Sequence, residues 1–205
     1  MATLGCLEAW GPLMLLRTVG ALLFTCLSFL AAPNALIEAK AQGSTQSLVL
    51  SNKNIGALKL EKNAKLELQE LKRVFTGLSV EQKIGQQDGP DFVYYQVSDN
   101  DGELFWIKAD EDIATKIDSV HVVSAKIPDQ YGLRVGSTYA EVLRIRPRLR
   151  VETNDHFHTY IGHPKENVVY ELAVSYRKGY QGPDRKPTKQ ELANSKVKAL
   201  MWFAR

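Results

Sequence analysis

The chain has 205 residues, a formal net charge of +3 and only two cysteines, Cys6 and Cys26. Residues 42–205 therefore contain no thiol, which excludes thiol redox chemistry and cysteine metal sites from that part of the chain. A modest positive charge does not by itself indicate an anionic partner.

The N-terminal segment has the order of a secretory signal peptide. Arg17 precedes an uncharged apolar run from Val19 to Ala32, and small residues follow up to Ala41. A basic start, an apolar centre and an A-x-A exit are the three parts of such a signal. We therefore expect residues 1–41 to be a signal peptide with cleavage after Ala41, and the protein to be periplasmic or otherwise exported. For an exported protein we expect no nucleic acid as a partner.

Some details of this segment leave alternatives open. A start at Met14 would give a compact leader, so it is an alternative to Met1. The apolar run is shorter than the about 20 residues that a spanning helix needs, but an uncleaved leader would still be a membrane anchor. Cys26 is a candidate for lipidation, although Thr25 stands where Gly, Ala or Ser normally precedes a lipidated cysteine.

Residues 42–205 are predicted to form a single domain with internal repeats at about 55–127 and 131–203. Each copy opens with a glycine-marked extended segment, at Gly56 and Gly132. Apolar residues three and four positions apart follow, which is the spacing of one buried helical stripe. A chance likeness of two stretches with helices and strands is the alternative to a true repeat.

In the first copy, the helical stripe from Leu66 to Phe75 ends near Gly77. Asn100-Asp101-Gly102 is typical of a tight hairpin turn between two strands. Strands are predicted over residues 78–84, 92–97, 104–107 and 117–123.

In the second copy, Ser137 or Thr138 can cap a helix, and Glu141 lies three residues after Thr138, which is the spacing of a capping box. Pro147 stops that helix. A long loop is predicted over residues 177–193. Its part around Tyr180, within residues 176–187, is expected to be a mobile surface, and loops of this length are often functional or simply flexible. Strands are predicted over residues 148–153, 157–161, 168–176 and 197–203.

These elements predict an α+β fold. Two tandem helix-plus-antiparallel-sheet units would pack as one compact domain, with the sheet faces packed on helices and on each other. Each half is too small to be stable on its own, so one core is expected rather than two.

Several segments of the chain resemble a known family, the sigma-E-regulated envelope lipoproteins of Gram-negative bacteria, whose function is unknown. The resemblance covers roughly residues 48–203. It implies a periplasmic location and an α+β fold. The residues that carry it are Ile55-Gly56, Ile117-Asp118-Ser119-Val120, Ser124-Ala125-Lys126-Ile127, Gly132-Leu133-Arg134-Val135-Gly136-Ser137-Thr138 and the closing segment Val197 to Trp202.

Residues with metal-binding chemistry gather around residues 155–163. His156 and His158 would share one side of a strand, and His163 could return from the following turn to complete a zinc or copper site. The plainer interpretation is a polar strand edge with scattered histidines. We therefore predict no metal, no cofactor and no metal-binding residues.

Other candidate sites are weaker. Serines and histidines are present, but no Gly-x-Ser-x-Gly turn occurs, and His121 is expected to be a packed or edge residue of an apolar strand. The acidic residues 99–103 flank a hairpin turn and only faintly resemble a calcium loop. Five aromatic side chains are expected to be divided between the core and an outward binding patch: Phe92, Tyr94, Tyr95, Phe105 and Trp106.

The sequence thus predicts an exported protein that is not an enzyme and has no catalytic residues. The leading hypothesis is a module of the cell envelope that contacts a protein or the membrane surface, in envelope homeostasis. The alternative is a periplasmic protein that binds a small ligand or a metal. A concave pocket with converging polar groups would favour the alternative, and a flat aromatic patch would favour the partner hypothesis.

Overall fold

The structure is a computed structural model that describes residues 48–62, 64–86, 91–154, 156, 158–176 and 186–205. All of these residues belong to one compact unit, Ala41–Arg205. The predictions for Met14, Cys26 and the cleavage after Ala41 fall outside the described residues, as does the prediction for Tyr180. None of the described helices is long and apolar enough to cross a membrane.

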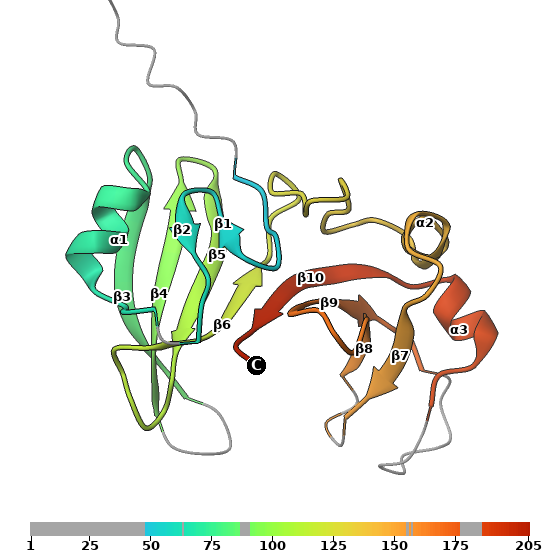
Figure 1. Cartoon of the computed structure of the whole chain (residues 1–205). Coiled ribbons are helices and arrows are strands. Elements are labelled where there is room, and N and C mark those ends of the chain that lie inside the picture. Colours follow the sequence, from blue (N-terminus) through green and yellow to red (C-terminus); the bar gives the residue numbers. More distant parts are fainter. Residues whose placement is uncertain (1–47, 63, 87–90, 155, 157, 177–185) are drawn as a thin grey trace, which may run out of the picture. The chain divides into compact units, whose positions relative to one another are not determined.

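The main element is one eight-stranded antiparallel sheet, with strand order β3-β4-β5-β6-β10-β9-β8-β7 (Figure 1). A separate small hairpin pairs β1 (Asn54–Ile55) with β2 (Leu58–Lys59). The strands of the large sheet are β3 (Ser79–Gly85), β4 (Phe92–Asp99), β5 (Gly102–Ala109), β6 (Ile117–Val122), β7 (Arg150–Thr153), β8 (Thr159–Gly162), β9 (Val168–Ala173) and β10 (Lys196–Phe203).

Three short helices accompany the sheet: α1 (Leu68–Val74), α2 (Tyr139–Ile145) and α3 (Lys189–Ala193). The fold is therefore mostly β. The predicted loop over residues 177–193 is wrong where it includes α3. That helix begins with a capping box between Thr188 and Glu191, a signal that is present in the sequence.

The predicted face-to-face packing of two sheets is wrong. The strands of both halves lie in one sheet, because β6 pairs with β10 in antiparallel register from Val122 opposite Leu200 to Ser119 opposite Phe203. These two strands would otherwise be sheet edges with unpaired N–H and C=O groups. Their pairing removes both edges and makes the sheet continuous.

One face of the sheet carries the hydrophobic core. Alternate residues of the strands point to this face, and α1, α2 and α3 contribute Leu71, Val142 and Leu192 to the same buried cluster. Phe75, just after α1, packs edge-on against Phe105 of β5 with 5.2 Å between ring centroids. All three helices therefore contribute to the same hydrophobic core.

Local sequence signals explain the turns and helix ends. The β4–β5 turn is confirmed: Asp99 pairs with Gly102, whose φ of 135° is a conformation that favours glycine. The capping box of α2 is also confirmed, since the Thr138 side chain accepts from the backbone N–H of Glu141 and the Glu141 carboxylate accepts from the backbone N–H of Thr138.

A buried polar network joins the segment before α2 to the sheet. The Tyr170 hydroxyl donates to Asp129 Oδ2 at 2.6 Å and accepts from Arg146 Nη1 at 2.7 Å. Asp129 Oδ1 accepts the backbone N–H groups of Tyr131 and Leu133, so its carboxylate is surrounded by donors. Buried charges require such partners, and here they fix the position of α2 relative to β9.

Candidate functional site

The face of the sheet opposite the core, here called the open face, contains a groove of about 800 Å³. Its residues come from β4, β5, β6, β8, β9 and β10 and from the segments that flank them. They are Phe92, Trp106, Lys108, Glu111, Asp118, Ser119, His121, Asn154, His156, His158, Tyr160, Glu171, Lys198, Met201 and Phe203.

The register of the sheet places the floor of the groove. Trp106 of β5 lies opposite His121 of β6, His121 lies opposite Met201 of β10, and Met201 lies opposite Val169 of β9. Residues opposite one another in an antiparallel sheet share a face, so these side chains form a line across four strands. Val169, Ala199 and Met201 form a small hydrophobic cluster of their own, separate from the main core.

A row of aromatic rings crosses one end of this floor; we call Phe92, Tyr94, Trp106, His121 and Phe203 the aromatic row. Trp106 and His121 are stacked, with 3.7 Å between ring centroids and 7° between the ring planes. Phe203 meets His121 edge-on at 6.1 Å, and Tyr94 meets Trp106 edge-on at 5.8 Å. Phe92 lies 6.0 Å from Tyr94, which completes a continuous set of contacts from β4 to β10.

Each of two irregularities in strand pairing places one additional charged side chain on the open face. On β6, Ser119 pairs with Lys108 and Ile117 pairs with Ala109, which leaves Asp118 as an extra residue. On β10, Val197 pairs with Leu172 and Ala199 pairs with Glu171, which leaves Lys198 as an extra residue. A β-bulge of this kind redirects a side chain that regular alternation would send to the other face.

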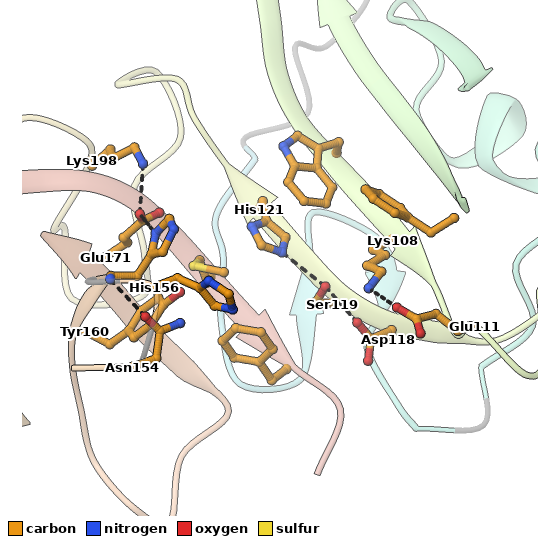
Figure 2. Close-up of a pocket in the computed structure, with 15 residues that line it drawn as sticks. Lys108, Glu111, Asp118, Ser119, His121, Asn154, His156, Tyr160, Glu171 and Lys198 are labelled. Atoms are coloured by element: carbon orange, nitrogen blue, oxygen red, sulfur yellow. Dashed lines mark hydrogen bonds and ion pairs between the residues drawn. The ribbon is translucent and has the colours of Figure 1, made fainter. Parts of the chain in front are cut away.

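The first polar cluster of the groove contains Asp118, Ser119 and His121. The Ser119 hydroxyl donates to Asp118 Oδ2 at 3.1 Å, and it lies 3.1 Å from His121 Nε2 (Figure 2). Because the one hydroxyl proton goes to the carboxylate, His121 donates from Nε2 in this arrangement. Burial lowers the pKa of His121 to about 4, and the nearby Glu171 carboxylate only partly opposes this effect. His121 is therefore neutral at pH 7.

The second polar cluster contains His158, Glu171 and Lys198. Glu171 Oε1 lies 2.7 Å from His158 Nδ1 and 2.8 Å from Lys198 Nζ (Figure 2). Burial of Glu171 favours the neutral acid, but the hydrogen bonds from Lys198 and His158 outweigh it and hold the pKa of this carboxyl below its usual range. The cluster is thus a buried carboxylate with its own cation.

The three histidines of the candidate metal site, which the sequence did not favour, do not come together. His156 and His158 precede β8 and line the groove, whereas His163 follows β8 and lines a separate small cavity with Arg150 and Arg205. In the part of the chain that the structure describes, no group of three or more His, Cys, Asp or Glu residues is placed to hold a metal ion.

The five predicted aromatic residues divide between the two faces. Tyr95 and Phe105 are buried in the core, Phe92 and Trp106 line the groove, and Tyr94 packs edge-on against Trp106. His121 is packed as predicted, but on a central strand rather than at an edge.

Several polar and apolar residues that line the groove were not predicted from the sequence. Glu171 and Met201 lie in strands whose apolar sequence predicts burial in the core. The alternation of side chains in β9 and β10 shows which face each residue is on only after the register is known. Asp118 and Lys198 depend on the two bulges, which have no composition signal in this sequence. The Ser119 and His121 spacing of two residues was a visible signal that they share a face.

Comparison with known proteins identifies the fold alone. No family model matches the chain, and no curated protein matches it. The crystal structure of the uncharacterized protein YfeY from Escherichia coli is similar, with a TM-score of 0.57 and 16% sequence identity. The match covers 76% of this chain and 99% of that one. The β-rich fold of this protein is therefore shared with an uncharacterized protein.

Proposed function

We propose that the protein is a non-enzymatic binding protein of the cell envelope, and that the groove on its open face holds a small ligand. The single observation that supports this proposal is the groove itself. Its volume of about 800 Å³ lies within the range of known small-molecule sites, about 300–1,000 Å³. Its lining combines four members of the aromatic row, Phe92, Trp106, His121 and Phe203, with converging polar groups, as such sites do.

The experiment is a screen of a small-molecule library of amino acids, amines, sugars and carboxylates by NMR chemical-shift mapping. A ligand of the groove should shift resonances of residues on β5, β6, β9 and β10. Met201→Lys places a charged chain in the floor and should abolish those shifts. Ile84→Lys is the matched control, because Ile84 is 68% exposed at the end of β3 and does not line the groove.

Circular dichroism would first establish that both variants retain the native fold. Ligands whose shifts map away from the groove, or that bind the Met201→Lys variant as well as the parent, would contradict the proposal.

The contacts of Ser119 support a binding role over hydrolysis. Its hydroxyl lies close to a histidine, as in a nucleophile–base pair, but the residue is only 1% exposed and its proton is held by Asp118. A nucleophile has to reach the substrate carbon, which a buried hydroxyl on a central strand does not do. We expect the protein to bind its ligand but not to turn over ester or amide substrates.

A second candidate function is contact with a protein of the envelope. The observation that favours it is Ile84, whose 68% exposure is large for an isoleucine on an edge strand. Exposed sheet edges readily accept an additional strand. If β3 is the contact, a pull-down from envelope extract should lose a partner with Ile84→Asp and keep it with Met201→Lys. Equal recovery with both variants would reject this surface.

We also infer an envelope address and a repeat. The expected signal peptide and the residues that carry the family resemblance support membership in the sigma-E-regulated envelope lipoprotein family. The element order supports a tandem repeat, since a helix precedes β3–β6 and a second helix precedes β7–β9 and β10. Mass spectrometry of the protein isolated from cells would test the address by showing cleavage after Ala41 or a lipid on Cys26.

A further inference from the structure

We propose that the ligand of the groove is an organic cation, a primary ammonium or guanidinium group on an apolar stem, and that Asp118 binds its charged group. This inference rests on the proposed function, since it assigns the chemistry of the same groove.

The charges that line the groove leave one carboxylate without a counterion. Lys108 Nζ is paired with Glu111 at 2.8 Å, and Lys198 Nζ is paired with Glu171 at 2.8 Å. Among the described residues Asp118 makes no ion pair. The lysine and carboxylate side chains of the lining therefore sum to a charge of −1, because Asp118 is the carboxylate left over, and this charge attracts a cation.

An anion would be a poor occupant by the same reasoning. It would have to compete with Glu111 for Lys108 or with Glu171 for Lys198, and it would lie near the unpaired charge of Asp118. Breaking a partly buried ion pair leaves an uncompensated charge, which is strongly unfavourable.

Asp118 is held ready to accept a donor. Its Oδ2 atom accepts from Ser119, which is itself fixed by the contact with His121, and both partners lie in the paired part of β6. Within the described residues Oδ1 accepts no hydrogen bond. A carboxylate whose orientation is fixed on one side and free on the other loses little conformational entropy when it binds a ligand.

The surface beside Asp118 suits the carbon skeleton of a cation. Phe203 lies directly opposite Ser119 in the sheet, and the floor continues with Met201 and Val169. Aromatic faces attract cations, and the chain shows this itself, since Lys108 Nζ lies 4.8 Å from the centroid of the Phe92 ring. The neutral state of His121 adds no opposing charge at the centre of the row.

The test compares three probes of similar shape: 2-phenylethylammonium, neutral 2-phenylethanol and anionic 3-phenylpropanoate. Isothermal titration of the full chain at pH 7.5 should give tightest binding for the ammonium probe, by about tenfold or more over the alcohol, which corresponds to one charge-assisted contact. Asp118→Asn should remove this preference, because the amide retains an acceptor for Ser119 but has no charge. Asp112→Asn is the matched control, since Asp112 is an exposed carboxylate outside the groove.

The outcomes separate the two proposals. Equal binding of the ammonium and the alcohol, or an ammonium affinity unchanged by Asp118→Asn, overturns the cation assignment. If Met201→Lys still abolishes binding in that case, the groove remains the ligand site. If the ammonium probe does not bind at millimolar concentration while another library molecule shifts groove resonances, only the cation assignment fails. If nothing in the library shifts these resonances, the proposed function fails with it.

Discussion

The protonation of one side chain on the open face, His121, is linked to the free energy of unfolding. Its pKa is about 4 in the folded protein and near 6.5 in an unfolded chain. Between these values the unfolded chain binds a proton that the folded protein does not, so the free energy of unfolding falls as the pH falls. We predict a loss of about 2 kcal/mol between pH 7.5 and pH 5, measured by urea denaturation.

The controls for this prediction use the same pH range. His121→Phe keeps an aromatic ring against Trp106 and should flatten the dependence, whereas His163→Gln, away from the groove, should not. Carboxyls with lowered pKa values, such as Glu171 and Asp99, lose their contribution only below their ordinary pKa of about 4.5 or less, so they do not affect this interval. A parent protein that is equally stable at both pH values would contradict the assignment.

Helix α2 shows how a local sequence signal stabilises a single element. Thr138 caps α2 through both halves of a capping box, and replacing a capping threonine by alanine typically costs about 1 kcal/mol. We predict this loss for Thr138→Ala in urea denaturation. Thr138→Ser keeps the hydroxyl and should restore most of the stability. Equal losses in the two variants would show that the methyl group, not the cap, matters.

Sequence and structure agree best where the signal is local. The β4–β5 hairpin was predictable because Asn100-Asp101-Gly102 supplies the turn and the positive φ of Gly102, and α2 was predictable because its cap and stop residues adjoin it. The bulges at Asp118 and Lys198 were not, since a bulge depends on the partner strand. Two of the five lysine and carboxylate residues that line the groove therefore became visible only with the register.

At the scale of the whole molecule, the β6–β10 pairing and the shared core join both halves. We predict a single cooperative unfolding transition, even when one half is weakened. Leu71→Ala in α1 and Leu172→Ala in β9 each empty a buried site and should each lower the free energy of unfolding by about 2–5 kcal/mol. Far-ultraviolet circular dichroism and tryptophan fluorescence should report the same midpoint in each variant. Separate transitions for the two halves would contradict this prediction.

The sequence could not reveal the single sheet. Alternating apolar residues place a strand in a core, but they do not say which strand lies beside it, and Val120 and Trp202 are buried in either arrangement. The pairing of β6 with β10 joins segments that are separated by α2, β7, β8, β9 and α3. The groove spans this pairing, so its existence follows from a long-range contact rather than from any motif.

That same pairing has a consequence for how quickly the protein folds. The β6–β10 ladder closes a long loop, and contacts between distant parts of a chain form slowly because the loop entropy must be lost first. Until β10 is in place, β6 and β9 each present an unpaired edge in the middle of the future sheet. We therefore expect the docking of β10 to limit the refolding rate, and the partly folded chain to be the form most prone to aggregate.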